Sequence, residues 1–110
     1  MATYVIDIDG TICSDTSGNY YQALPYSSRI KYINSLYDLG HQIIYFTARG
    51  MGTFKNDINS AEKKWELLTR SQLIDWGVKY HELRFGKPSA NFYIDDKNVS
   101  LENFFNQPLI

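Results

Sequence analysis

The chain has 110 residues, and its eleven Lys and Arg against twelve Asp and Glu give a formal net charge of −1. This length allows one domain, residues 1–110, and the charge balance provides no general attraction to nucleic acid or to an anionic membrane surface. The single cysteine, Cys13, excludes an internal disulfide framework, and no apolar stretch approaches the about 18 residues of a membrane span. No signal peptide is visible, so a soluble, cytoplasmic domain is expected.

Strand-like and helix-like segments alternate in the first half of the chain. The run Thr3–Ile8 is β-branched and apolar until its end, which is typical of a buried parallel strand. Residues 14–24 are polar and predict a loop or small flap. Pro25 then opens a helix that ends at Gly40, and a second apolar strand follows at residues 43–46.

The second half continues the same alternation. After a polar loop at residues 50–57, a helix carries apolar residues at helical spacing and ends before Gly77. A short third strand is expected over Val78–His81, a last strand over Asn91–Ile94 and a brief helix over Leu101–Phe105. This order predicts an α/β fold, a Rossmann-like three-layer sandwich with a central parallel sheet covered on both faces.

Polar side chains gather where three of the predicted strands end. These residues are Asp7 and Asp9 after the first strand, Thr47 and Arg49 after the second, and Asp95 and Asp96 after the last. Each pair is also explained by an ordinary turn when it is taken alone. Because ligand sites in parallel α/β sheets lie beyond the carboxyl ends of the strands, the three pairs are expected at one rim of the sheet.

The four acidic residues at this rim predict a metal site. Asp7 and Asp9 are two positions apart, so in a strand both side chains point the same way. With Asp95 and Asp96 beside them the carboxylates would repel one another, and a Mg²⁺ ion relieves that repulsion. Lys87 lies between Gly and Pro in the loop before the last predicted strand, where its charge could neutralise a transferring phosphoryl group.

These residues lie in segments that resemble the four motifs of the haloacid dehalogenase-like phosphohydrolases. The segments span almost the whole chain and are Val5–Thr11, Ile44–Thr47, Gly86–Pro88 and Phe92–Asp96. Residues 47–51, 86–88 and 93–97 are further similar to the small capsule-biosynthesis phosphatases of that superfamily. The resemblance implies a haloacid dehalogenase-like core and a Mg²⁺-dependent phosphomonoesterase that works through an aspartyl-phosphate.

The resemblance also implies a role for each residue. Asp7 would be the nucleophile and Asp9 the general acid and base, while Thr47 and Lys87 would hold the phosphoryl oxygens. The remaining substrate contacts would come from Gly10, Thr11, Ala48 and Arg49, although Arg49 fits a salt bridge at the sheet end equally well. Mg²⁺ would be held by Asp7, the backbone carbonyl of Asp9, and Asp95, with Asp96 acting through water or orienting Lys87.

The chain leaves no room for the folded cap that many members of this superfamily insert. The site is therefore expected to be open, unless a homo-oligomer covers it, and to take a small phosphorylated metabolite such as a sugar phosphate of polysaccharide biosynthesis.

Two other functions fit parts of the pattern. An open site would also suit a nucleic-acid end phosphatase, which the −1 charge disfavours, and a phosphoaccepting receiver-like module would use Asp, Thr and Lys in a different order along the chain.

Overall fold

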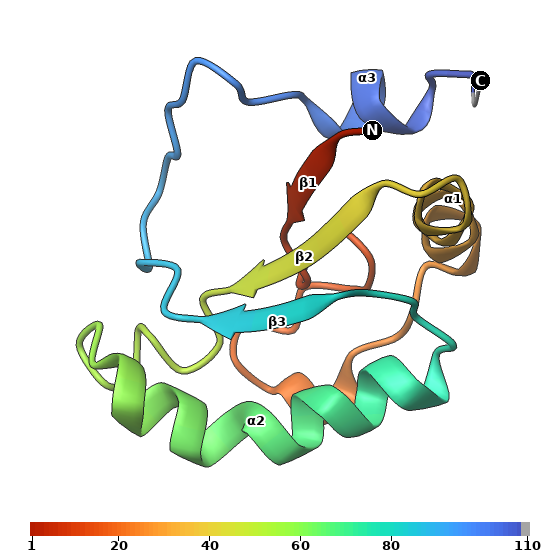
Figure 1. Ribbon diagram of the computed structural model, residues 1–110. Helices are drawn as coiled ribbons and strands as arrows, with labels where there is room; N and C mark the ends of the chain where they lie inside the picture. The colour runs from red at the N-terminus through yellow and green to blue at the C-terminus, as the bar shows by residue number, and fades with distance from the viewer. Residues whose placement is uncertain (109–110) are drawn as a thin grey trace.

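A three-stranded parallel sheet forms the centre of the computed structural model, which describes residues 1–108 (Figure 1). The elements in chain order are β1 (Thr3–Ile6), the 3₁₀-helix η1 (Tyr20–Gln22), α1 (Ser27–Asp38), β2 (Gln42–Thr47), α2 (Ile58–Asp75), β3 (Glu82–Phe85) and α3 (Leu101–Phe105). The strand order is β1-β2-β3, with Tyr45 of β2 beside both Ile6 of β1 and Leu83 of β3. The expectation of an α/β fold with a parallel sheet is confirmed.

One face of the sheet carries the core. Ile6 of β1 and the neighbouring Tyr45 of β2 belong to the same buried cluster as Ile33 of α1 and Leu73 of α2. Both long helices therefore pack on this face. When parallel strands are added one after another in the same direction across a sheet, right-handed crossovers place the connecting helices on the same face. Val5, which alternates with Ile6 and points to the other face, is 62% exposed. Within residues 1–108 the helix packing of this cluster lies on one face, and the cover of both faces in a three-layer sandwich stays a prediction.

The third strand lies later than expected, at Glu82–Phe85 rather than at Val78–His81. The backbone before it is already bonded elsewhere, because the Val78 amide donates to the carbonyl of Leu73 at the end of α2. The side chain of Asn34 accepts from the Lys79 amide and donates to the Gly77 carbonyl. These bonds attach residues 77–79 to α1 and α2, so the strand that pairs with β2 begins only after these residues.

The last expected strand, Asn91–Ile94, is not formed. The chain leaves the sheet after β3, follows an outward path and returns to α3 near the start of β1 (Figure 1). The helix expected at Leu101–Phe105 is confirmed, and the Ser100 side chain caps it by accepting from the Asn103 amide. Phe104 of this helix packs on Tyr4, 5.7 Å between ring centroids, which holds the C-terminal segment at that end of the sheet.

The first two helices match the expected positions. α1 begins two residues after Pro25, and α2 is capped by Asp57, whose carboxylate accepts from the amides of Asn59 and Ser60. None of the helices within residues 1–108 combines the length and the apolar character needed to cross a membrane.

Candidate active site

A cavity of about 460 Å³ lies beyond the carboxyl ends of β1 and β2. Its lining comes from the loop after β1, the flap around η1, the loop after β2 and the start of the C-terminal segment. These residues are Asp7, Asp9, Asp15, Ser17, Gly18, Tyr20, Ala48, Gly52, Thr53, Lys87, Ser89, Ala90 and Tyr93. The sequence prediction of a site at this rim therefore coincides with a concave, mostly polar surface.

Asp7 and Lys87 face each other inside this cavity. The Lys87 Nζ atom lies 3.7 Å from the Asp7 carboxylate, and the Lys87 backbone amide donates to the Thr47 carbonyl over 3.1 Å. Burial raises the pKa of the Asp7 carboxyl from 3.8, and the Lys87 charge offsets only part of that rise. The Tyr93 ring lies 4.2 Å from Lys87 Nζ and covers the ammonium group on one side. β1 and β3 thus bring together an acidic and a basic side chain that are 80 positions apart.

Asp9 is held by a buried arginine. Arg49 Nε lies 2.9 Å from one Asp9 oxygen and Nη2 lies 3.0 Å from the other, so the pair is bidentate. The Arg49 side chain is fully buried, and its Nη1 also donates to Thr69 over 3.0 Å and to Gln72 over 2.6 Å, both on α2. Arg49 does not line the cavity, so of its two expected roles the structure shows the buried ion pair, and substrate contact stays a prediction. Arg49 fixes the orientation of the Asp9 carboxylate.

Three other expected site residues are used by the fold. Thr47 is fully buried at the end of β2, and its hydroxyl oxygen accepts from the Arg49 amide over 3.1 Å. Thr11 is also buried, and Gly10 lies in the turn that follows β1, where its amide donates to the Cys13 carbonyl over 2.8 Å. Of the phosphate-holding and substrate-contacting residues that the sequence indicated, only Lys87 and Ala48 line the cavity.

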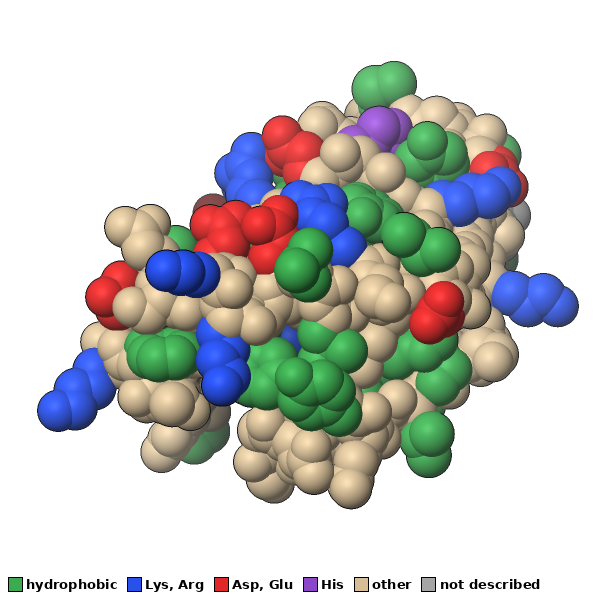
Figure 2. Space-filling model, turned by 90° about the horizontal axis from the view of Figure 1, so that it is seen from below, with side chains coloured by type: hydrophobic (Ala, Val, Ile, Leu, Met, Phe, Trp, Pro, Cys, Tyr) green, Lys and Arg blue, Asp and Glu red, His purple; other side chains and the backbone are tan. Residues whose placement is uncertain are grey.

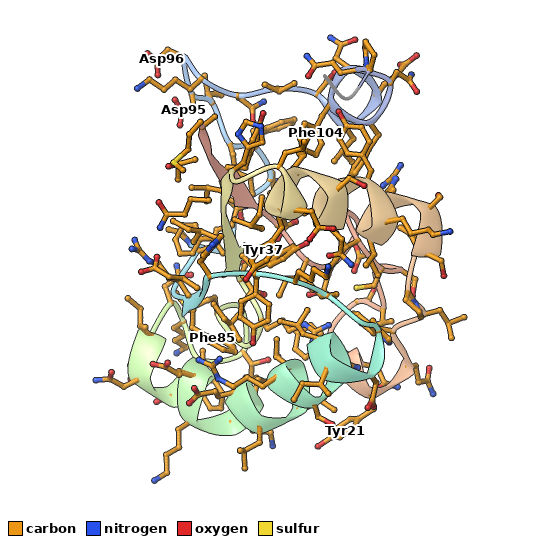
Figure 3. All side chains as sticks on the ribbon, turned by 45° about the vertical axis from the view of Figure 1, so that its right-hand side comes forward. Tyr21, Tyr37, Phe85, Asp95, Asp96 and Phe104 are labelled. Carbon is orange, nitrogen blue, oxygen red and sulfur yellow. The ribbon has the colours of Figure 1, made fainter. Side chains whose placement is uncertain are left out.

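The four acids expected to hold Mg²⁺ do not come together. Asp7 and Asp9 line the cavity, whereas Asp95 and Asp96 are exposed on the C-terminal segment, far from Phe85 at the carboxyl end of β3 (Figure 3). Asp95 accepts from the Lys97 amide, which lowers the pKa of its carboxyl, so it serves its own turn. Residues 1–108 of one chain contain no group of three His, Cys, Asp or Glu side chains that could hold a metal. The residues as placed do not fit a Mg²⁺ site.

Tyr20 is a cavity residue that the sequence reasoning did not single out. It lies in the flap, its hydroxyl oxygen accepts from the Gly50 amide over 3.0 Å, and its ring centroid is 4.9 Å from Arg49 Cζ. Trp65 of α2 packs edge-on against the same ring at 4.7 Å. The sequence contained a signal for this residue, because it is a large aromatic within a polar loop. A ring in such a loop stays exposed unless it packs against another part of the fold.

The chain was matched by no protein-family model and by no curated protein. Among solved structures, the crystal structure of an MCSG target from Vibrio cholerae is similar, with a TM-score of 0.90 at 28% sequence identity. The match covers 99% of this chain and 91% of the Vibrio cholerae chain. The shared fold therefore extends into the C-terminal segment that follows β3.

Proposed function

We propose that this protein is a phosphomonoester hydrolase with a haloacid dehalogenase-like core. The observation that carries the proposal is the placement of Asp7, whose carboxylate follows β1 and faces the cavity with the Lys87 ammonium 3.7 Å away. A carboxylate nucleophile beside a fixed positive charge is what phosphoryl transfer to an aspartate needs, because the reaction depends on positioning and on charge neutralisation. The motif resemblance of the same residues supports the assignment.

The proposed reaction has two halves. An Asp7 oxygen attacks phosphorus, the bond from phosphorus to the ester oxygen breaks, and the leaving alkoxide takes a proton from Asp9. Water then attacks the aspartyl-phosphate, transfers its proton to Asp9, and inorganic phosphate leaves with the Asp7 carboxylate restored. Arg49 keeps Asp9 in one orientation for both proton transfers, and Lys87 stabilises the negative charge of the phosphoryl oxygens.

The dimensions of the site favour a small substrate. A cavity of about 460 Å³ is in the range that encloses a metabolite-sized ligand. On the face of the molecule shown in Figure 2, acidic and basic side chains are scattered among other residues and form no continuous basic tract of the kind that binds a nucleic-acid backbone. A phosphorylated sugar is the proposed substrate class, and release of inorganic phosphate from a panel of phosphorylated metabolites is the experiment that tests it.

Removal of the Lys87 charge is expected to weaken catalysis more than folding. In Lys87→Met the phosphoryl oxygens lose their positive partner, so kcat/KM should fall by about 10²–10³-fold. Lys63→Met, which removes an exposed lysine from α2, is the matched control and should stay within about two-fold of the wild type. Phosphate release measured for both variants checks the prediction, and equal activities would contradict the role of Lys87.

We further propose that the hydrolase depends on Mg²⁺, as the acidic residues of the sequence indicate. Chelation of divalent ions is expected to abolish phosphate release, and added Mg²⁺ to restore it, while circular dichroism shows the domain still folded. Full activity in excess chelator would exclude metal dependence. In residues 1–108 of one chain the four carboxylates do not lie together. Mg²⁺ dependence therefore requires an arrangement that brings Asp95 and Asp96 to Asp7 and Asp9.

A further inference from the structure

The segment that follows β3 has the sequence of a strand but pairs with no strand within residues 1–108, and its contact with the site is made by the Tyr93 ring on Lys87. Residues 91–100 are all exposed, including Phe92 at 83% and Ile94 at 97%. The hydrogen bonds inside it are local, such as those from the Lys97 and Asn98 amides to Asp95. Apolar side chains at this exposure indicate a surface that is covered in the working protein.

The sheet edge that could pair with this segment is the outer edge of β1. Within residues 1–108 β1 pairs with β2 alone, so its other edge presents unpaired backbone groups. Beside this edge Val5 is 62% exposed, whereas Ile44, its neighbour on β2, is buried. A parallel strand laid along β1 would continue the sheet and carry its own last residues to the rim where Asp7 lies.

The chain cannot readily supply this strand to itself. If Asp95 lay level with Asp7, Asn91 would lie level with Thr3, about 13 Å back along the sheet at about 3.3 Å per residue. The Lys87 backbone lies beyond the carboxyl ends of the strands, where its amide donates to the Thr47 carbonyl and its side chain reaches Asp7, and three residues join it to Asn91. Those three residues, which include Pro88 and Ser89, would have to be fully extended to cover this distance, so none of them remains to form the turn that reverses the chain. An antiparallel strand would carry Asp95 to the wrong end of β1.

We propose that two copies of this chain exchange residues 91–96, each segment adding as a fourth parallel strand to β1 of the other copy and bringing its Asp95 and Asp96 to the Asp7 of that copy. The exchange removes the conflict, because Lys87 stays at the Asp7 of its own chain while the following residues cross to the other. In a two-fold dimer the contact is made twice. The catalytic consequence rests on the proposed function, whereas the exchange itself rests on the unpaired edge and segment.

The register of the exchanged strand accounts for the exposed apolar residues. With Asp95 level with Asp7, Tyr93 lies level with Val5, and Phe92 and Ile94 fall on the same face as Ile6, where the core lies. The Vibrio cholerae structure matches this chain over 99% of its length, so the matched region includes residues 91–96.

Disulfide trapping tests the exchange without reference to activity. Val5→Cys and Tyr93→Cys chains, mixed and oxidised, should form a covalent dimer of about twice 12.8 kDa. The native Cys13 is buried and its pKa is raised to about 12, so it should not react. Val5→Cys mixed with Leu67→Cys, an exposed residue of α2, is the control and should give no comparable product. In the double variant Val5→Cys/Tyr93→Cys, a disulfide within one chain would overturn the proposal, as would a monomeric wild type in light scattering.

Mixing two inactive variants tests the shared site. Asp7→Asn and Asp95→Asn should each be inactive alone, and co-refolding them should restore about a quarter of the wild-type activity, because half of the dimers then hold one intact site of two. No recovery, or full activity of Asp95→Asn alone, would overturn the shared site. A covalent dimer from Val5→Cys and Tyr93→Cys together with an inactive wild type would reject the proposed function and keep the exchange. Loss of activity in Asp7→Asn without any covalent dimer would reject the exchange and keep the proposed function.

Discussion

The Asp7→Asn variant is expected to lose about 10⁴-fold or more in turnover, because a carboxamide cannot form the aspartyl-phosphate. Asp9→Asn keeps the nucleophile and loses the proton transfers, so its expected loss is smaller, about 10²–10⁴-fold. Steady-state phosphate release measures both. Acid quench followed by mass analysis should find phosphate on the peptide that contains Asp7 in the wild type and none in Asp7→Asn. Near-normal turnover of Asp7→Asn would contradict the covalent mechanism.

The Asp7→Asn substitution should also stabilise the fold of the metal-free protein at neutral pH. Burial raises the pKa of the Asp7 carboxyl from 3.8, so its ionised form is less favourable in the folded chain than in the unfolded one. That cost is present above the folded pKa, and it disappears as the pH falls below the unfolded pKa. Thermal unfolding in chelator should therefore give a higher Tm for Asp7→Asn at pH 7, with the difference shrinking toward pH 4. A lower Tm at pH 7 would show that the Lys87 contact outweighs the burial.

Arg49→Met is expected to reduce the free energy of unfolding by about 3–5 kcal/mol, because it leaves Asp9 without its partner in a buried pair. The Arg49 guanidinium also donates to Thr69 and Gln72 on α2, so the loss removes the polar link between the site and that helix. Arg49→Lys keeps the charge but not the bidentate geometry, and it should recover only part of the stability.

Arg70→Met provides the matched control for this measurement. Arg70 forms an ion pair with Glu66 at the surface of α2, with both side chains about 40% exposed. Such pairs contribute about 0–1 kcal/mol, so urea unfolding should separate the two arginines clearly. A loss below about 1 kcal/mol for Arg49→Met would show that Asp9 does not depend on Arg49.

Local sequence patterns were sufficient for most of the elements and for part of the site. The apolar periodicity and the stop signals placed α1, α2 and β2, because these depend on neighbouring residues and on one buried face. The rule that parallel strands end at one rim placed Asp7 and Asp9 at the cavity, but it did not hold for Asp95 and Asp96. Asp9 and Arg49 show the limit, because both are polar residues after strands, and their types alone do not tell a substrate contact from a buried ion pair.

Only the tertiary structure decided which partners these groups take. Arg49 is turned away from the cavity because Thr69 and Gln72 of α2 accept from it, and these residues are 20 and 23 positions further along the chain. The segment Asn91–Ile94 has the composition of a strand, but pairing needs an edge within reach, and the short connection after Lys87 does not provide one in the same chain. Strand propensity is set by sequence, whereas strand pairing is set by the distance between the segments that must meet.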